Sequence, residues 1–91
     1  MKKAMRLFLT GNMQSLFYKQ SIKDVADGYN VRGFLRIKSD GKVEIFLEGE
    51  SGNVDTVVDI CKAGPKYAQV RSFEQKEEKL QDFKDFRIIN F

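Results

Sequence analysis

The spacing of apolar residues along this chain switches between a strand-like and a helix-like repeat, and this switching constrains the fold more than any other feature. In residues 4–10 successive side chains fall on opposite faces, and apolar residues recur at every second position, as in a β-strand. From about residue 16 the apolar residues fall three or four apart, which predicts a helix. Gly28 to Asn30 ends that helix, because Gly and Asn tolerate a left-handed backbone. The predicted apolar stripe consists of Tyr18, Ile22, Val25, Ala26 and Tyr29.

The middle of the chain predicts a β-hairpin followed by a second helix. Residues 31–38 and 43–48 alternate again, and Asp40-Gly41 between them is typical of a hairpin turn. The alternation places Ile37 on the inner face of the first of these strands. The second helix is predicted over residues 54–62, with Ser51 or Asn53 as its cap and with the apolar stripe Val54, Val57, Val58 and Cys61.

Two strand-like segments remain, residues 67–75 and 84–90. The charged run 74–79 is expected to be a solvated turn or the frayed end of a strand. The predicted order is therefore β-α-β-β-α-β plus a short terminal strand. Right-handed crossovers then favour a single domain over residues 1–91, of the α+β class. Its arrangement is the ferredoxin-like split β-α-β, an antiparallel sheet with both helices on one face.

Composition excludes several classes of chemistry. The chain has no histidine and one cysteine, so it lacks Ser-His and Cys-His nucleophile pairs and most zinc chemistry. Its helical aspartates are separate surface carboxylates, and we expect neither a metal nor a cofactor. No apolar run approaches the roughly 20 residues of a membrane span. We therefore expect a soluble, cytoplasmic monomer that does not act at a membrane.

The charge is uneven along the chain. Residues 1–45 hold nine Lys/Arg against four Asp/Glu, a net +5, while the whole chain carries +3. A basic half of this kind favours an anionic partner. The segment Gly11 to Leu16 joins the first strand to the first helix, where unpaired backbone N–H groups lie beside the positive end of a helix dipole. Such a connection can bind phosphate or carboxylate, although most connections of this kind bind nothing, and Lys19 in the first helical turn could add its ammonium group.

Two motifs in this half resemble those of the acylphosphatase family. The stretch GNMQSLFYK (residues 11–19) is similar to the family pattern G-x-V-Q-G-V-x-F-R. The stretch GFLRIKSDG (residues 33–41) is similar to G-W-V-R-N-x-x-D-G. Smaller similarities follow around Ala63-Gly64-Pro65 and in the Phe86-Arg87-Ile88 ending, so the resemblance covers residues 5–91.

The resemblance implies an activity. The family hydrolyses the acyl–phosphate bond of small carboxyl phosphates without a metal or cofactor. Its loop amides and an arginine hold the phosphoryl oxygens, and an asparagine orients the attacking water. Carried over to this chain, the arginine position is Lys19 and the asparagine position is Ile37. The phosphate-binding loop is expected to consist of Asn12, Met13, Gln14, Ser15, Leu16, Phe17 and Tyr18.

The chain departs from the family at both decisive positions. Lys19 keeps the positive charge but lacks the planar fork of arginine. Ile37 has neither a hydrogen-bond donor nor an acceptor, so it cannot hold a water molecule. Ser15 replaces a loop glycine, which matters if the loop needs a positive φ. We expect weak or lost acyl phosphate hydrolysis by a protein whose ligand is a small anion, phosphate or acyl phosphate. The alternative is a pseudoenzyme, that is, a non-catalytic anion-binding or interaction module. Asn12 or Gln14 is an alternative holder of the water.

A second class of function is nucleic-acid binding. The RNA-recognition motif has the same order of elements and stacks bases on aromatic residues of its open sheet face. Phe8, Phe34 and Phe46 are candidates for such a face. However, the stretch that resembles the second RNA-binding signature lies on the second strand rather than the third, and the third strand carries Glu44 and Glu48, which repel phosphates. We therefore favour a small anion over nucleic acid.

Overall fold

The computed structural model of the chain describes residues 1–12, 16–63 and 69–89. Seven elements follow one another in the predicted order. They are β1 (Lys2–Asn12), α1 (Leu16–Gly28), β2 (Arg32–Ile37), β3 (Val43–Glu50), α2 (Ser51–Ala63), β4 (Gln69–Glu78) and β5 (Phe86–Ile89). The predicted fold class is confirmed.

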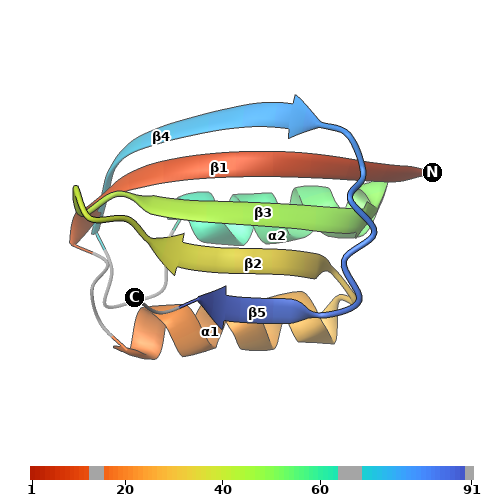
Figure 1. Cartoon of the computed structure of the whole chain (residues 1–91), viewed down its shortest axis with the longest axis horizontal. Coiled ribbons are helices and arrows are strands. Elements are labelled where there is room, and N and C mark those ends of the chain that lie inside the picture. Colours follow the sequence, from red (N-terminus) through yellow and green to blue (C-terminus); the bar gives the residue numbers. More distant parts are fainter. Residues whose placement is uncertain (13–15, 64–68, 90–91) are drawn as a thin grey trace.

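The strands form one five-stranded sheet in the order β4-β1-β3-β2-β5. Strand β1 pairs antiparallel with β3 and β4, and β2 pairs antiparallel with β3. These four strands and two helices make the ferredoxin-like arrangement, with both helices against one face of the sheet (Figure 1). The terminal strand β5 extends the sheet beyond β2 and is parallel to it. We call the face without helices the open face.

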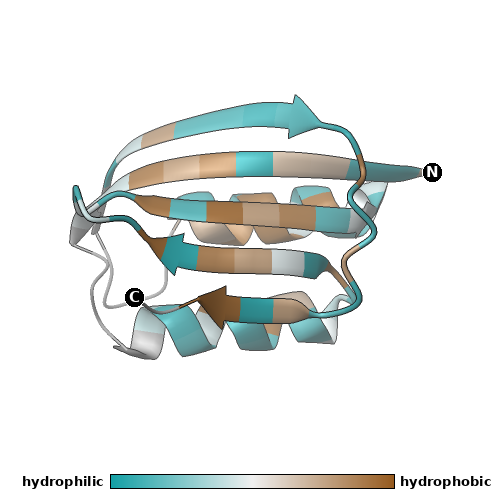
Figure 2. Ribbon diagram, in the orientation of Figure 1, coloured by the Kyte–Doolittle hydropathy of each residue, from teal (hydrophilic) through white to brown (hydrophobic). Residues whose placement is uncertain are grey.

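The core lies between the sheet and the helices. Met5, Leu7 and Leu9 of β1 are buried there, as their alternation predicts. Figure 2 shows that apolar residues concentrate on the central strands, whereas β4 at the edge is largely hydrophilic. Burial of apolar side chains in this layer is the main favourable contribution to folding.

Two details of the helix predictions were wrong. Tyr29 was placed on the apolar stripe of the first helix, but it lies after the end of α1 and is 41% exposed. The chain reverses there because Asn30 adopts a positive φ of 57°, as predicted for a helix terminator. Helix α2 begins at Ser51 rather than at residue 54, and the Ser51 amide donates to the Met1 carbonyl at 2.7 Å.

The charged run 74–79 is mostly strand. Strand β4 continues to Glu78 because β1 pairs with it as far as Ala4 opposite Glu78. An edge strand has one solvent-facing side, so charged residues are stable in it. No helix within the described residues is long and apolar enough to cross a membrane.

Candidate functional site

The strand directions bring the two predicted catalytic positions to the same end of the sheet. Both β1 and β2 are antiparallel to β3, so their carboxyl ends lie at the same end of the sheet (Figure 1). Helix α1 begins at that end, after the connection from β1. Lys19 lies in the first turns of α1, and Ile37 is the last residue of β2. The fold therefore places the start of α1 and the end of β2 at one end of the molecule.

Ile37 faces the helices. It pairs with Val43 of β3, which in turn pairs with Leu9 of β1, so the three residues form a row across the sheet. Val43 and Leu9 are fully buried, and Ile37 is half-buried and packs against the core cluster. The prediction that Ile37 extends the inner face is confirmed. Its side chain presents only carbon and hydrogen at this end of the sheet.

The polar side chains of Thr10 in β1 and Lys38 just after β2 point the other way. The Thr10 hydroxyl forms a hydrogen bond with the Ser72 hydroxyl, and the Lys38 ammonium lies 5.6 Å from the centre of the Phe8 ring. Thr10 and Lys38 immediately follow Leu9 and Ile37, and strand alternation places them on the open face. They are therefore not replacements for a polar group at position 37.

The start of α1 carries no acidic residue in its first turn. The positive end of its dipole is therefore not neutralised by a neighbouring carboxylate of the same helix. Lys19 is half-buried beside it. This arrangement suits an anion electrostatically.

The predicted phosphate-binding loop includes the end of β1, the start of α1 and the residues between them. Asn12 is the last residue of β1, and Leu16, Phe17 and Tyr18 are the first residues of α1. The predictions for Met13, Gln14 and Ser15 lie outside the described residues. Phosphate binding by this segment stays a prediction.

Tyr18 contributes its side chain to the core. It is 1% exposed, and its hydroxyl has no hydrogen-bond partner among the described residues. Burial raises the pKa of this hydroxyl well above its usual value, with a further contribution from Cys61. Cys61 is also fully buried, and burial raises the pKa of its thiol to about 12. The prediction of a core thiol is confirmed.

Sequence reasoning missed an ionic network on the open face. Glu44 of β3 is 3% exposed and accepts hydrogen bonds from Arg6 of β1 and, at 2.5 Å, from Arg36 of β2. The Arg6 guanidinium also contacts Glu78 of β4, at 3.0 Å. The hydrogen bond from Arg6 lowers the pKa of Glu78, which remains ionised to lower pH than usual. Charged residues alternate along these strands in the sequence, but the strand register decides which of them form pairs.

An aromatic cluster lies beside this network. Phe34 and Phe46 stack with ring centres 6.0 Å apart, and Phe83 contacts both, at 5.7 Å and 5.5 Å. The Arg6 guanidinium lies 5.1 Å from the centre of the Phe46 ring. Phe46 is fully buried, so its ring offers no surface for a nucleic-acid base in this conformation.

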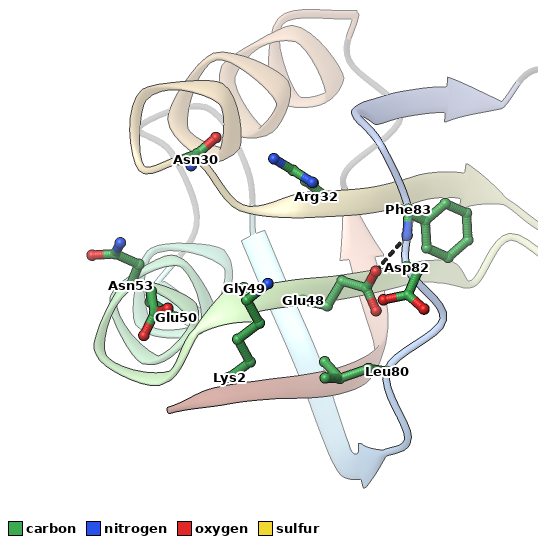
Figure 3. Close-up of a pocket in the computed structure, with 10 residues that line it drawn as sticks. All are labelled: Lys2, Asn30, Arg32, Glu48, Gly49, Glu50, Asn53, Leu80, Asp82 and Phe83. Atoms are coloured by element: carbon green, nitrogen blue, oxygen red, sulfur yellow. Dashed lines mark hydrogen bonds between the residues drawn. The ribbon is translucent and has the colours of Figure 1, made fainter.

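A cleft of about 120 Å³ lies at the opposite end of the sheet, near the end of β3 and Phe83 (Figure 3). Its charged side chains are of both signs, including Lys2, Arg32 and Asp82, so it has no clear preference for an anion. Within residues 1–12, 16–63 and 69–89, no three His, Cys, Asp or Glu side chains cluster as metal ligands would.

Comparisons with known proteins agree with the motifs at residues 11–19 and 33–41. A family model described as acylphosphatase matches residues 5–88. An acylphosphatase of Pyrobaculum islandicum is 42% identical over 85 residues, covering 91% of this chain and 90% of that protein. One of Rubrobacter xylanophilus is 38% identical over 76 residues, covering 84% and 69%.

Solved structures show the same fold. The structure of an acylphosphatase from Coxiella burnetii has a TM-score of 0.89 at 24% identity, covering 97% of this chain and 93% of that one. The crystal structure of acylphosphatase from Bacillus subtilis has a TM-score of 0.88 at 24% identity, covering 98% and 99%. Together with the matching family model and the sequence relatives, these findings show that the chain belongs to the acylphosphatase family.

Proposed function

We propose that this protein binds small acyl phosphates at the connection between β1 and α1 and hydrolyses them slowly, without a metal or cofactor. The observation that carries the proposal is the position of Ile37. It ends β2 beside the start of α1 and packs half-buried against the core, where the family mechanism needs a polar side chain. We also propose that the protein is a cytoplasmic monomer.

Binding is the part of the reaction that the site is best suited to. Phosphoryl transfer depends mainly on positioning and on stabilising negative charge. Backbone N–H groups at the start of α1 and the Lys19 ammonium supply positive charge. Lysine binds phosphate as a point charge, so it holds the group less specifically than the bidentate fork of arginine.

Catalysis is the part that Ile37 impairs. Hydrolysis needs a water molecule held in line with the bond between phosphorus and the carboxyl oxygen. The water attacks phosphorus as the carboxylate leaves, and its proton passes to an oxygen of the phosphate product. An aliphatic side chain offers that water no hydrogen bond. Removing one preorganised polar group from an active site costs about 10²–10³ in rate. We therefore expect a slow enzyme that still binds its substrate.

The test is hydrolysis of a small acyl phosphate such as acetyl phosphate, corrected for the uncatalysed rate. The wild type is compared with the double variant Lys19→Arg/Ile37→Asn. We expect the double variant to gain at least about a hundredfold in kcat/KM, because one restored polar group is worth about that much. The matched control is Lys62→Arg/Ile60→Asn, which makes the same changes at an exposed lysine and a half-buried isoleucine of α2. It should gain nothing.

The other outcomes are equally informative. A wild-type rate that already equals that of the double variant would show that another group holds the water and that the role assigned to Ile37 is wrong. If neither protein hydrolyses the substrate, a phosphate titration followed by amide chemical shifts shows whether the protein still binds the anion. Shifts confined to the start of α1 would then support the alternative, a non-catalytic anion-binding protein, and Ser15 becomes the next position to restore.

A further inference from the structure

The segment between β4 and β5 runs along the open face from one edge of the sheet to the other (Figure 1). We call residues 79–85 the crossover. It must span four strand spacings, roughly 19 Å at about 4.8 Å each. The eight steps from Glu78 to Phe86 reach about 27 Å when extended. The crossover therefore uses most of its length and has little slack.

The carboxylate of Glu48 holds the crossover in place. Glu48 lies on β3 and is 4% exposed. One carboxylate oxygen accepts the Gln81 N–H at 2.7 Å, and the other accepts the Phe83 N–H at 2.5 Å. Figure 3 shows the carboxylate of Glu48 directed at the crossover backbone beside Phe83. Hydrogen bonds of a backbone N–H to an ionised group are among the stronger ones in proteins.

This part of the chain makes its other contacts with the aromatic cluster, β2 and α1. Phe83 packs on Phe34 and Phe46, and the Gly33 amide donates to the Asp85 carbonyl at 3.0 Å. Beyond them, the Lys23 ammonium donates to the Phe86 carbonyl at 3.2 Å, and β5 pairs only with β2. Within the described residues, Phe86 is the one member of the core cluster that lies after residue 78.

The rest of the sheet does not depend on β5 for its topology. Strands β1 to β4 and both helices already form a complete β-α-β-β-α-β unit, which contributes every buried member of the core cluster except Phe86. The crossover also contains Asp82 at a positive φ of 60°, a conformation that costs a residue other than Gly some strain. Units with few buried contacts open before the global fold does.

We propose that residues 79–89 form a latch that opens and closes as a unit on a sheet that remains folded, with Glu48 as the main anchor of the crossover and the buried Phe86 as that of β5. When closed, the latch covers Phe34, Phe46 and the outer edge of β2. When open, it exposes all three. The proposal does not rest on the catalytic assignment, because the Glu48 anchor lies at the end of β2 opposite Ile37.

Native-state hydrogen exchange of the full chain, followed by NMR, tests the latch. The reporter is the Gly33 amide, which donates its hydrogen bond to the Asp85 carbonyl of the latch. The variant is Glu48→Gln, in which the side-chain amide can accept only one of the two backbone N–H groups. We expect Gly33 exchange to accelerate about tenfold or more, as for the loss of a hydrogen bond to a charged group. Amides of the β1–β3 ladder should be unchanged.

The matched control is Glu50→Gln, two residues along the same strand and exposed, where Gly33 exchange should stay at the wild-type rate. If Glu48→Gln fails to fold, Phe83→Ala removes the second anchor from the crossover side and should give the same selective acceleration. The latch is excluded if Gly33 exchanges together with the β1–β3 amides in the wild type. It is also excluded if the variants accelerate all of these amides equally.

Discussion

Tyr18 brings a hydroxyl group into the core without giving it a hydrogen-bond partner among the described residues. A buried polar group without a partner costs about 1–3 kcal/mol relative to one that is satisfied. The aromatic ring fills space between α1 and the rest of the core, and phenylalanine retains that ring. The residue therefore combines favourable packing with an unfavourable polar atom.

We expect Tyr18→Phe to raise the free energy of unfolding by about 1 kcal/mol, measured by urea denaturation, because it removes only the unpaired hydroxyl. Tyr29→Phe is the matched control, since Tyr29 is 41% exposed and its hydroxyl has access to water. That control should leave the stability within about 0.5 kcal/mol. A loss of stability in Tyr18→Phe would show that the hydroxyl has a partner after all.

At the scale of the elements, Gly33 sets how closely β2 approaches β3. It has a positive φ of 141°, a conformation that L side chains rarely adopt. A Cβ atom there would lie 1.8 Å from the carbonyl oxygen of Phe46 on β3. This obstacle is backbone, which cannot turn away as a flexible side chain would. Gly33 is also one of the residues that match the second family motif.

Gly33→Ala should therefore lower the free energy of unfolding by about 3 kcal/mol or more, from overpacking and backbone strain together. Thermal or urea unfolding measures it. Gly52→Ala is the control, because Gly52 lies in α2 with nothing within 4 Å of an added Cβ. That change should be neutral or stabilise by up to about 1 kcal/mol. Equal effects at the two positions would contradict the close approach of β2 and β3.

At the scale of the whole molecule, one buried carboxylate joins the strands across the open face. Glu44 on β3 pairs with Arg6 of β1 and Arg36 of β2, and Arg6 continues to Glu78 of β4. Four of the five strands are linked in this way. The arginines are partly exposed, so solvent weakens part of their interaction.

We expect Glu44→Gln to lower the free energy of unfolding by about 2–4 kcal/mol, because it leaves two arginines around a neutral side chain in a largely buried place. Urea unfolding at moderate salt measures it. Asp55→Asn breaks the Lys3–Asp55 pair, in which Asp55 is 57% exposed, and should cost less than about 1 kcal/mol. Equal losses in the two variants would mean that the network contributes no more than a surface pair.

The sequence by itself determined the order of the elements, the inner face of each central strand, and the places of Lys19 at the start of the first helix and Ile37 at the end of a strand. These follow from local periodicity and from motif spacing, which survive in any fold that buries one face of each element. Ile37 is the clearest case, because alternation alone placed it on the inner face and the structure confirms that position. The loop chemistry of residues 13–15 stays a prediction.

Only the tertiary structure decided what the charged and aromatic residues of the open face do. Glu44 and Glu48 were read as repelling groups on an exposed surface, yet one collects two arginines and the other holds the crossover. The pairing of β5 with β2 and the length of β4 were decided in the same way. The physical reason is that strand register and chain crossings join residues far apart in sequence, and an alternating charged strand has the same local pattern whether its charges meet water or each other.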